Sequence, residues 1–308
     1  MRLLFFVLLI FSFDVQSKIP EPGYGLPELA SEARIKELNS KKRAKVMTPS
    51  VQRKMQRVLE ALDEAGILEQ EQALLKKEKK DKEAEAKDKE IAKAIANGQR
   101  ELDDLKTRLA SLQSYDRSMY YYYSAYYNLA YQDKISEAMN NYVKLVAEKD
   151  TAEKLRVNAY YVLAQLYLSE SNYESGLDYL LRWFKNTAEV NPDGYVLLGQ
   201  AYYLLADKES TKSKVLASYQ KAYNNMVEAK RLADEKQIRF RENWYSLLLA
   251  SMGELDLKNE QVPVYEEILE LYPKKKYFVN LAGLYNDLDR QRDYTALLKT
   301  AYTKQLLD

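Results

Sequence analysis

The residue types that most enzymes use for acid–base or nucleophilic chemistry are missing from this sequence. It contains no histidine and no cysteine, which removes imidazole chemistry, thiolate nucleophiles, disulfide bonds and nearly every structural zinc arrangement. The reactive groups that remain include 46 Asp and Glu residues and 27 tyrosines. Two acids held across a cleft, with tyrosines stacked on a sugar, would suit hydrolysis of a glycosidic bond.

No acid pair of that kind stands out, because most of the acids lie on the surfaces of expected helices. Glu242, beside Trp244, is explained more simply as an acid at a helix start. We therefore expect a protein that is not an enzyme, with no catalytic residues, no cofactor and no metal ligands. The 47 Lys and Arg residues balance the acids to a net charge of +1, so nucleic acid is not an expected partner.

The elements that would position binding residues are helices. With 9 Gly and 7 Pro in 308 residues, the chain has too few turn residues for an all-β fold. From residue 120 onward, similar apolar positions recur at separations of 38, 35, 49 and 34 residues. The residues that anchor this comparison are Tyr126, Ala164, Gly199, Leu248 and Ala282. A period of 34 indicates tetratricopeptide repeats, so we predict an all-α, right-handed tetratricopeptide solenoid over residues 119–308.

Four consecutive tyrosines at residues 120–123 open this region. They point in four directions around a helix and cannot all enter one core. We expect a helix that packs on two sides, with Tyr122 and Tyr126 on one side and Tyr123 and Tyr127 on the other. An exposed aromatic binding patch is the alternative.

The first 17 residues have the features of an export signal. Arg2 precedes an apolar run of eleven residues from Leu3 to Phe13, which is too short to span a bilayer. We place cleavage after Ser17, and the absence of cysteine excludes a lipoprotein. In a Gram-negative cell the product would be periplasmic, and peripheral to the membrane at most. An uncleaved anchor or an apolar first helix remain the alternatives.

Residues 18–47 are expected to form a leader and linker, because residues 18–30 hold three Pro and two Gly. Residues 48–118 are expected to form a charged helical arm that includes a degenerate first repeat. Thr48 and Pro49 give its helix start, and Gly66 is expected to end that helix. At Asn97-Gly98 the pattern favours a hairpin turn over one long rod.

The same arm has a short heptad pattern, whose members are Ile91, Ile95, Leu102, Leu105, Leu109 and Leu112. Two heptads are weak support for a coiled coil. The arm is therefore either a protruding contact or oligomerisation element or a soluble charged insertion, and the oligomeric state stays open.

Several phrases go beyond the generic repeat. They are Thr48-Pro49, residues 161–167, residues 195–203, residues 242–248, residues 272–277 and the ending at residues 301–307. They resemble the periplasmic tetratricopeptide proteins encoded with TonB, ExbB and ExbD energy-transduction systems. The resemblance covers residues 48–68 and 112–308, whereas residues 70–111 replace that family's compact first helix pair. It implies no catalytic residues, and protein partners such as a TonB-type transducer, the ExbB/ExbD complex or an associated receptor.

The export signal and the repeats predict a periplasmic scaffold that binds a peptide or helix in a concave groove, and the resemblance implies that it supports TonB-dependent uptake. The first helices of the pairs should line that groove with Asn158, Tyr161, Gln165, Leu168, Val196, Gln200, Tyr203, Tyr245, Leu249 and Asn286. The alternative is an envelope adaptor of the Tol-Pal division or outer-membrane assembly type, which would trimerise through a coiled-coil arm.

Overall fold

The structure is a computed structural model that describes residues 23–40 and 45–303. Within these ranges the chain forms thirteen α-helices and one short 3-10 turn and has no strand, which confirms the all-α class. None of the helices found there is long and apolar enough to cross a membrane. The predicted export signal at residues 1–17 lies outside the described residues, and so do residues 304–307 of the family-like ending.

The chain divides into two compact units. One contains residues 27–190, and the other contains residues 191–308 together with the residues up to Leu26. The divisions therefore fall after Leu26 and after Val190, whereas the sequence pattern placed a boundary between residues 118 and 119.

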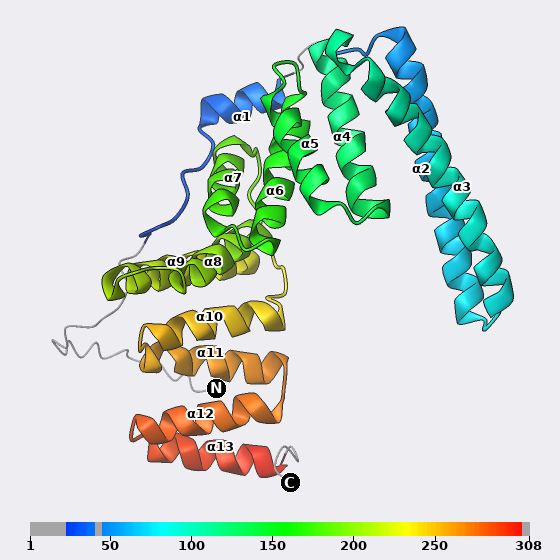
Figure 1. Ribbon diagram of the computed structural model, residues 1–308. Coiled ribbons are helices and arrows are strands. Elements are labelled where there is room, and N and C mark those ends of the chain that lie inside the picture. The colour runs from blue at the N-terminus through cyan, green and yellow to red at the C-terminus, as the bar shows by residue number, and fades with distance from the viewer. Residues whose placement is uncertain (1–22, 41–44, 304–308) are drawn as a thin grey trace, which may run out of the picture. The chain divides into compact units, whose positions relative to one another are not determined.

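The unit of residues 27–190 holds the first seven helices (Figure 1). These are α1 (Glu32–Asn39), α2 (Pro49–Lys77), α3 (Asp81–Thr107), α4 (Ser114–Tyr131), α5 (Ile135–Ala147), α6 (Glu153–Ser169) and α7 (Tyr173–Asn186). Helix α1 lies in the stretch expected to be a linker. Ser31 caps it by accepting a hydrogen bond from the Arg34 N–H at 3.2 Å, and an N-cap of this kind starts a short helix that periodicity alone does not reveal.

Helices α2 and α3 form a long antiparallel hairpin (Figure 1). Its turn is Glu78–Lys80, so two predictions were wrong: Gly66 lies inside α2 and Gly98 lies inside α3. Lys79 adopts φ 60, and the Lys80 N–H donates to the Leu75 carbonyl oxygen at 2.9 Å. This is the Schellman helix ending. It was missed because lysine occupies the left-handed position at which the sequence pattern looks for glycine.

The same three-residue turn joins further helix pairs. Its central residue has a φ of 52 to 58 at Asp133, Ser171, Asp256 and Asp289. At Asn172, Leu257 and Arg290 the N–H donates to the carbonyl oxygen five residues earlier, as it does at Lys80, whereas the Lys134 N–H donates to that of Asn128, six residues earlier. A helical hairpin that recurs with one turn geometry is typical of helical-repeat proteins.

The inner halves of α2 and α3 share a core with α4, α5 and α6. The buried members include Val51, Met55, Val58, Leu102, Leu105, Tyr120, Tyr121, Tyr127, Tyr142, Leu145 and Leu163. Leu109 and Leu112 of the heptad pattern pack against this core. These heptad residues therefore pack within the unit's own core.

The run of tyrosines is mainly a core feature, as expected. Tyr120, Tyr121 and Tyr127 are buried, whereas Tyr126 is 42% exposed. Helix α4 carries its buried stripe through Tyr120, Ser124 and Tyr127. Tyr126 was expected to pack and to anchor the first repeat, and this prediction was wrong, because its side chain points about a third of a helical turn away from the buried stripe.

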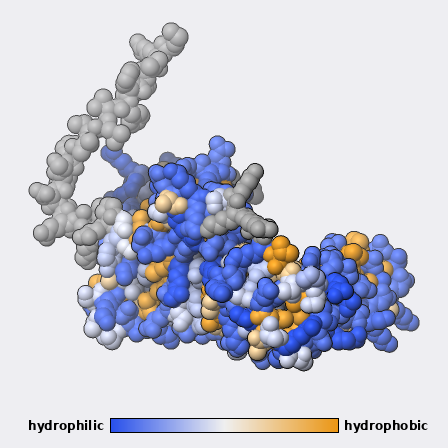
Figure 2. Space-filling view, turned by 90° about the horizontal axis from the view of Figure 1, so that it is seen from above, coloured by the Kyte–Doolittle hydropathy of each residue, from blue (hydrophilic) through white to orange (hydrophobic). Residues whose placement is uncertain are grey.

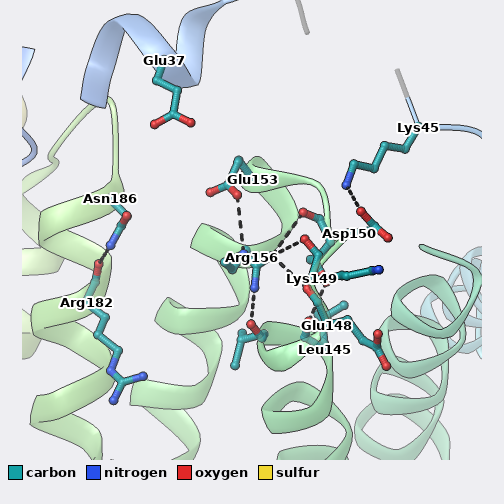
Figure 3. A network of polar contacts seen from close by, with 12 residues as sticks. Glu37, Lys45, Leu145, Glu148, Lys149, Asp150, Glu153, Arg156, Arg182 and Asn186 are labelled. Atoms are coloured by element: carbon teal, nitrogen blue, oxygen red, sulfur yellow. Dashed lines mark hydrogen bonds and ion pairs between the residues drawn. The ribbon is translucent and has the colours of Figure 1, made fainter. Parts of the chain in front are cut away.

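Polar contacts fasten residues 28–40 and Lys45 to α6, to α7 and to the loop before α6 within the same unit. The Ala30 N–H donates to the Phe184 carbonyl oxygen at 3.1 Å, and Arg34 pairs with Glu153 at 2.6 Å. Lys45 reaches Asp150 at 2.6 Å, beside Arg156, which donates to the carbonyl oxygens at the end of α5 (Figure 3). Ala30, Arg34 and Lys45, all in the stretch expected to be a linker, are therefore held against the fold.

The second unit contains α8 (Pro192–Ala206), α9 (Lys212–Glu235), α10 (Glu242–Glu254), α11 (Lys258–Leu271), α12 (Lys275–Asp287) and α13 (Gln291–Thr303). Gly199 is buried, and a Cβ added there would lie 3.0 Å from the Met226 sulfur and 3.2 Å from the Ala222 carbonyl oxygen. A small residue is thus needed where α8 and α9 approach closely. The 24-residue α9 accounts for much of the longest repeat spacing.

Candidate peptide-binding site

The predicted groove residues come from α6 in one unit and from α8, α10 and α12 in the other. By exposure they fall into three groups. Asn158, Gln165, Gln200 and Asn286 are exposed. Tyr161, Val196 and Tyr203 are partly buried, and Leu168, Tyr245 and Leu249 are buried. The four exposed amide side chains are therefore the groove residues best placed to reach a ligand.

The last group was assigned wrongly, because its members are core residues. Tyr245 is 0% exposed, its hydroxyl donates to Glu267 at 2.7 Å, and its ring packs edge-on against Phe240. Leu168 and Leu249 are also in the core. Helix α10 is buried on more than one side, so a position counted as outward by helical period alone still packs inward.

Tyr161 and Tyr203 serve packing as well. The Tyr161 ring lies 5.0 Å from that of Trp183, and the Tyr203 ring lies 5.2 Å from that of Tyr219. Burial, followed by the nearby Glu254 and Asp207 carboxylates, raises the pKa of Tyr219 to about 12. Burial also raises the pKa of Tyr203, so Tyr203 and Tyr219 remain neutral at physiological pH.

A different peptide contact is formed on α9 by the chain itself. Residues Gly23–Leu26, the leader turn, form a β-turn in which the Leu26 N–H donates to the Gly23 carbonyl oxygen at 3.1 Å. Asn224 Nδ2 donates to the Tyr24 carbonyl oxygen at 2.9 Å. Asn225 Nδ2 donates to the Gly25 carbonyl oxygen at 3.1 Å. Two adjacent amides thus hold two adjacent main-chain carbonyls.

A cation and an aromatic ring complete what we call the leader-turn site, consisting of Tyr202, Lys221, Asn224 and Asn225. Lys221 Nζ lies 5.5 Å from the centre of the Tyr24 ring and 5.2 Å from that of Tyr202. Burial, and to a smaller extent Tyr24, raises the pKa of the Tyr202 phenol. Cation–π attraction to both rings therefore supplements the hydrogen bonds.

Sequence reasoning missed this site because it treated residues 18–30 as a leader and searched only the first helix of each pair. A signal was nevertheless present. Ser218, Ala222, Asn225, Ala229 and Leu232 follow a three- and four-residue spacing and are all buried. An asparagine on an otherwise small and apolar stripe needs a hydrogen-bonding partner, which here is the leader turn.

Exposed apolar side chains do not identify a second site. On the face drawn in Figure 2 they form separate patches among hydrophilic residues. The most exposed large ones include Ile67 and Leu74 on α2 and Val279 on α12. Scattered residues of this kind are normal on a protein surface, so the hydrogen-bonding groups are the more specific guide.

A cavity of about 290 Å³ lies among α11, α12 and α13. Leu269, Phe278 and Leu281 form apolar walls, and Glu266 and Asp293 lie at its polar side. Both acids already have partners: the Tyr285 hydroxyl donates to Glu266, and Arg290 donates to Asp293. Across the described residues, no group of three or more acids is arranged to hold a metal ion.

Glu242 joins two helices of the second unit. It is the first residue of α10 and accepts from Lys274 Nζ at 2.6 Å and from the Tyr277 hydroxyl at 2.7 Å. Lys274 first, then Tyr277 and Lys276, lower the pKa of Glu242 from 4.5 to about 2. This carboxylate thus links the starts of α10 and α12, in keeping with a helix-start role.

A Glu242→Gln variant should unfold at a lower urea concentration than the wild type at pH 7. Because the folded pKa is lowered, the wild type has this stabilisation in full above about pH 4.5 and loses it as the pH falls toward about 2. The difference between the two proteins should therefore shrink over that range. Trp244 fluorescence would follow the unfolding, with Glu270→Gln as a control. A difference that does not depend on pH would contradict the assignment.

No protein-family model matches this chain, and no curated protein matches it.

Proposed function

We propose that this protein is a non-enzymatic, protein-binding scaffold built from tetratricopeptide repeats. One observation carries the proposal: the amides of Asn224 and Asn225 hold the main-chain carbonyls of a peptide turn. Main-chain recognition of this kind lets a helical surface take a segment of another protein. The recurring helical hairpins, with their common turn, supply such surfaces in series.

The proposed setting is the periplasm, and the proposed partner is a TonB-type transducer or a receptor that works with it. Support for the setting comes from the short apolar run at residues 3–13. Support for the partner comes from the resemblance of residues 48–68 and 112–308 to periplasmic proteins of TonB, ExbB and ExbD systems. The exposed Asn158, Gln165, Gln200 and Asn286 are the proposed contact residues.

Replacing these four amides together by alanine should weaken binding to the periplasmic segment of a TonB-type transducer from the same genome. We expect a loss of at least about tenfold in affinity, since a few interface residues normally dominate binding. The residues are exposed, so the helix content should not change. Isothermal titration calorimetry would measure the affinity, with the protein purified in the form that the cell produces after any removal of the export signal.

A matched control replaces four exposed amides elsewhere, namely Gln52, Asn97, Asn140 and Asn259. This variant should bind as the wild type does. Equal binding by both quadruple variants would remove the groove assignment. Absence of any binding by the wild type would remove the transducer as the partner.

A further inference from the structure

We infer that the leader-turn site on α8 and α9 binds glycine-containing β-turns with an aromatic second residue, and that Gly23–Leu26 is its resident occupant. The inference rests on the proposed function and deepens it, because it specifies the kind of peptide that the scaffold takes.

The shape of the turn explains why two amides suffice to hold it. The Gly23 carbonyl oxygen is used inside the turn, where it accepts from the Leu26 N–H at 3.1 Å. The carbonyl oxygens of the two central residues, Tyr24 and Gly25, have no such role in a β-turn. Asn224 and Asn225 meet these two oxygens. Any turn of this shape offers the same pair of acceptors.

The third position of the turn admits only glycine. Gly25 has φ +77, the left-handed region that other residues enter at a cost. A Cβ added there would lie 2.8 Å from Lys221 Cβ and closer still to Lys221 Cγ. Both the backbone conformation and the wall of the site therefore select glycine.

The second position favours an aromatic residue. Lys221 Nζ is within cation–π distance of the Tyr24 and Tyr202 rings. Tyr24 remains 41% exposed, so the site contacts only part of this residue. A different aromatic residue could therefore take the place of Tyr24 at the second position.

The burial of Asn225 gives a further indication of a ligand. Its side chain is 0% exposed, and its Oδ1 atom has no hydrogen-bond donor among the described residues. A buried amide with an unfilled acceptor lowers the stability of a helix pair. Its position is explained if the amide serves to bind a peptide main chain.

A resident turn in the same chain competes with any partner turn, because a tethered segment has a high effective concentration, on the order of millimolar for short linkers. Gly25→Ala should release the leader turn by strain and by its clash with Lys221, while leaving α8 and α9 unchanged. The probe is a labelled peptide of residues 21–28 added to the full chain. We expect Gly25→Ala to bind it about tenfold more tightly than the wild type, since the left-handed conformation alone costs an L-residue about a factor of ten.

Two further variants define the site. Adding Asn224→Ala to Gly25→Ala should abolish peptide binding, and Lys221→Ala in the same background should weaken it. Leu29→Ala, at a half-exposed residue outside the turn, should behave as the wild type does. Circular dichroism would check that each variant retains its helix content.

Equal peptide binding by Gly25→Ala and the wild type would overturn the inference, as would binding that survives the loss of Asn224. These outcomes differ from failure of the proposed function. A scaffold that binds its own leader peptide but no transducer would keep the site and lose the partner. A scaffold that binds the transducer through the exposed amides but does not bind the leader peptide would keep the partner and lose the leader-turn site.

Discussion

Replacing Gly98 by alanine should destabilise the unit of residues 27–190 by about 2 kcal/mol, the typical cost of overpacking a well-filled core. Gly98 lies in the interior of α3, where alanine is otherwise the better helix former by about 1 kcal/mol. A Cβ at this position would lie 2.7 Å from Tyr127 Cζ and closer still to its hydroxyl. The clash should outweigh the gain in helix propensity.

The opposite partner allows the cause to be tested. The Tyr127 hydroxyl is buried and has no hydrogen-bond partner among the described residues, and burial raises its pKa to about 12. Removing it in Tyr127→Phe should leave stability unchanged or raise it by about 1 kcal/mol. In that background, Gly98→Ala should cost clearly less than in the wild type, a coupling of about 1 kcal/mol or more.

Urea unfolding would measure these effects one unit at a time. Trp183 belongs to this unit and Trp244 to the other, and the chain has no further tryptophan. A Trp244→Phe background therefore makes fluorescence report on residues 27–190. Gly66→Ala is the matched control: it lies inside α2 with open space around it and should stabilise by about 0.5–1 kcal/mol. If Gly98→Ala were also stabilising, the packing of α3 against α4 would have to be revised.

Replacing Arg117 by methionine should cost about 2 kcal/mol, because it leaves a mostly buried carboxylate without its cation. Arg117 Nε and Nη2 donate to the two oxygens of Glu148 at 2.6 and 2.8 Å. The Glu148 side chain is only 13% exposed, and it follows the last residue of α5. The pair therefore joins the start of α4 to the end of α5.

The effect should depend on pH in a defined direction. The hydrogen bond from Arg117 is the main reason that the pKa of Glu148 is lowered. The stabilisation is thus present above about pH 4.5, the ordinary value, and is lost as the pH falls through the lowered pKa. The gap between the wild type and Arg117→Met should close as the solution becomes more acidic.

Arg182→Met provides the control for this experiment. Arg182 pairs with Asp178 at 2.9 Å on the exposed face of α7, and pairs of this kind contribute about 0–1 kcal/mol. Unfolding of the same unit, followed by Trp183 fluorescence, would compare the two variants at several pH values. Similar losses for both would show that the Arg117–Glu148 pair has no special role.

These contacts matter for function because the geometry of a peptide site on paired helices depends on how the helices pack against one another. In the unit of residues 27–190, α2 and α3 form part of the core, so the charged hairpin is anchored where these two helices meet α4. In the other unit, close approach at Gly199 brings α8 and α9 together and thereby sets Tyr202 beside Lys221.

The amino-acid sequence was sufficient for the all-α class and for several helix positions. The start of α2 was predicted at Thr48 and Pro49, because proline at the first helical position is a local signal. Gly199 was identified as a repeat position and is buried against α9, because spacing along one helix reveals which face is buried. Such features depend on interactions between residues a few positions apart.

Other features depended on contacts between residues far apart in the chain, and only the tertiary structure decided them. Gly98 was expected to end a helix, yet it makes room for the Tyr127 hydroxyl within one. The hairpin turns instead at Lys79, where a residue without special preference is held in the left-handed conformation. Tyr245 was expected at the surface but is enclosed because α10 packs on more than one side. The leader turn meets Asn224 and Asn225 across 200 positions of sequence, a distance over which no periodicity carries information.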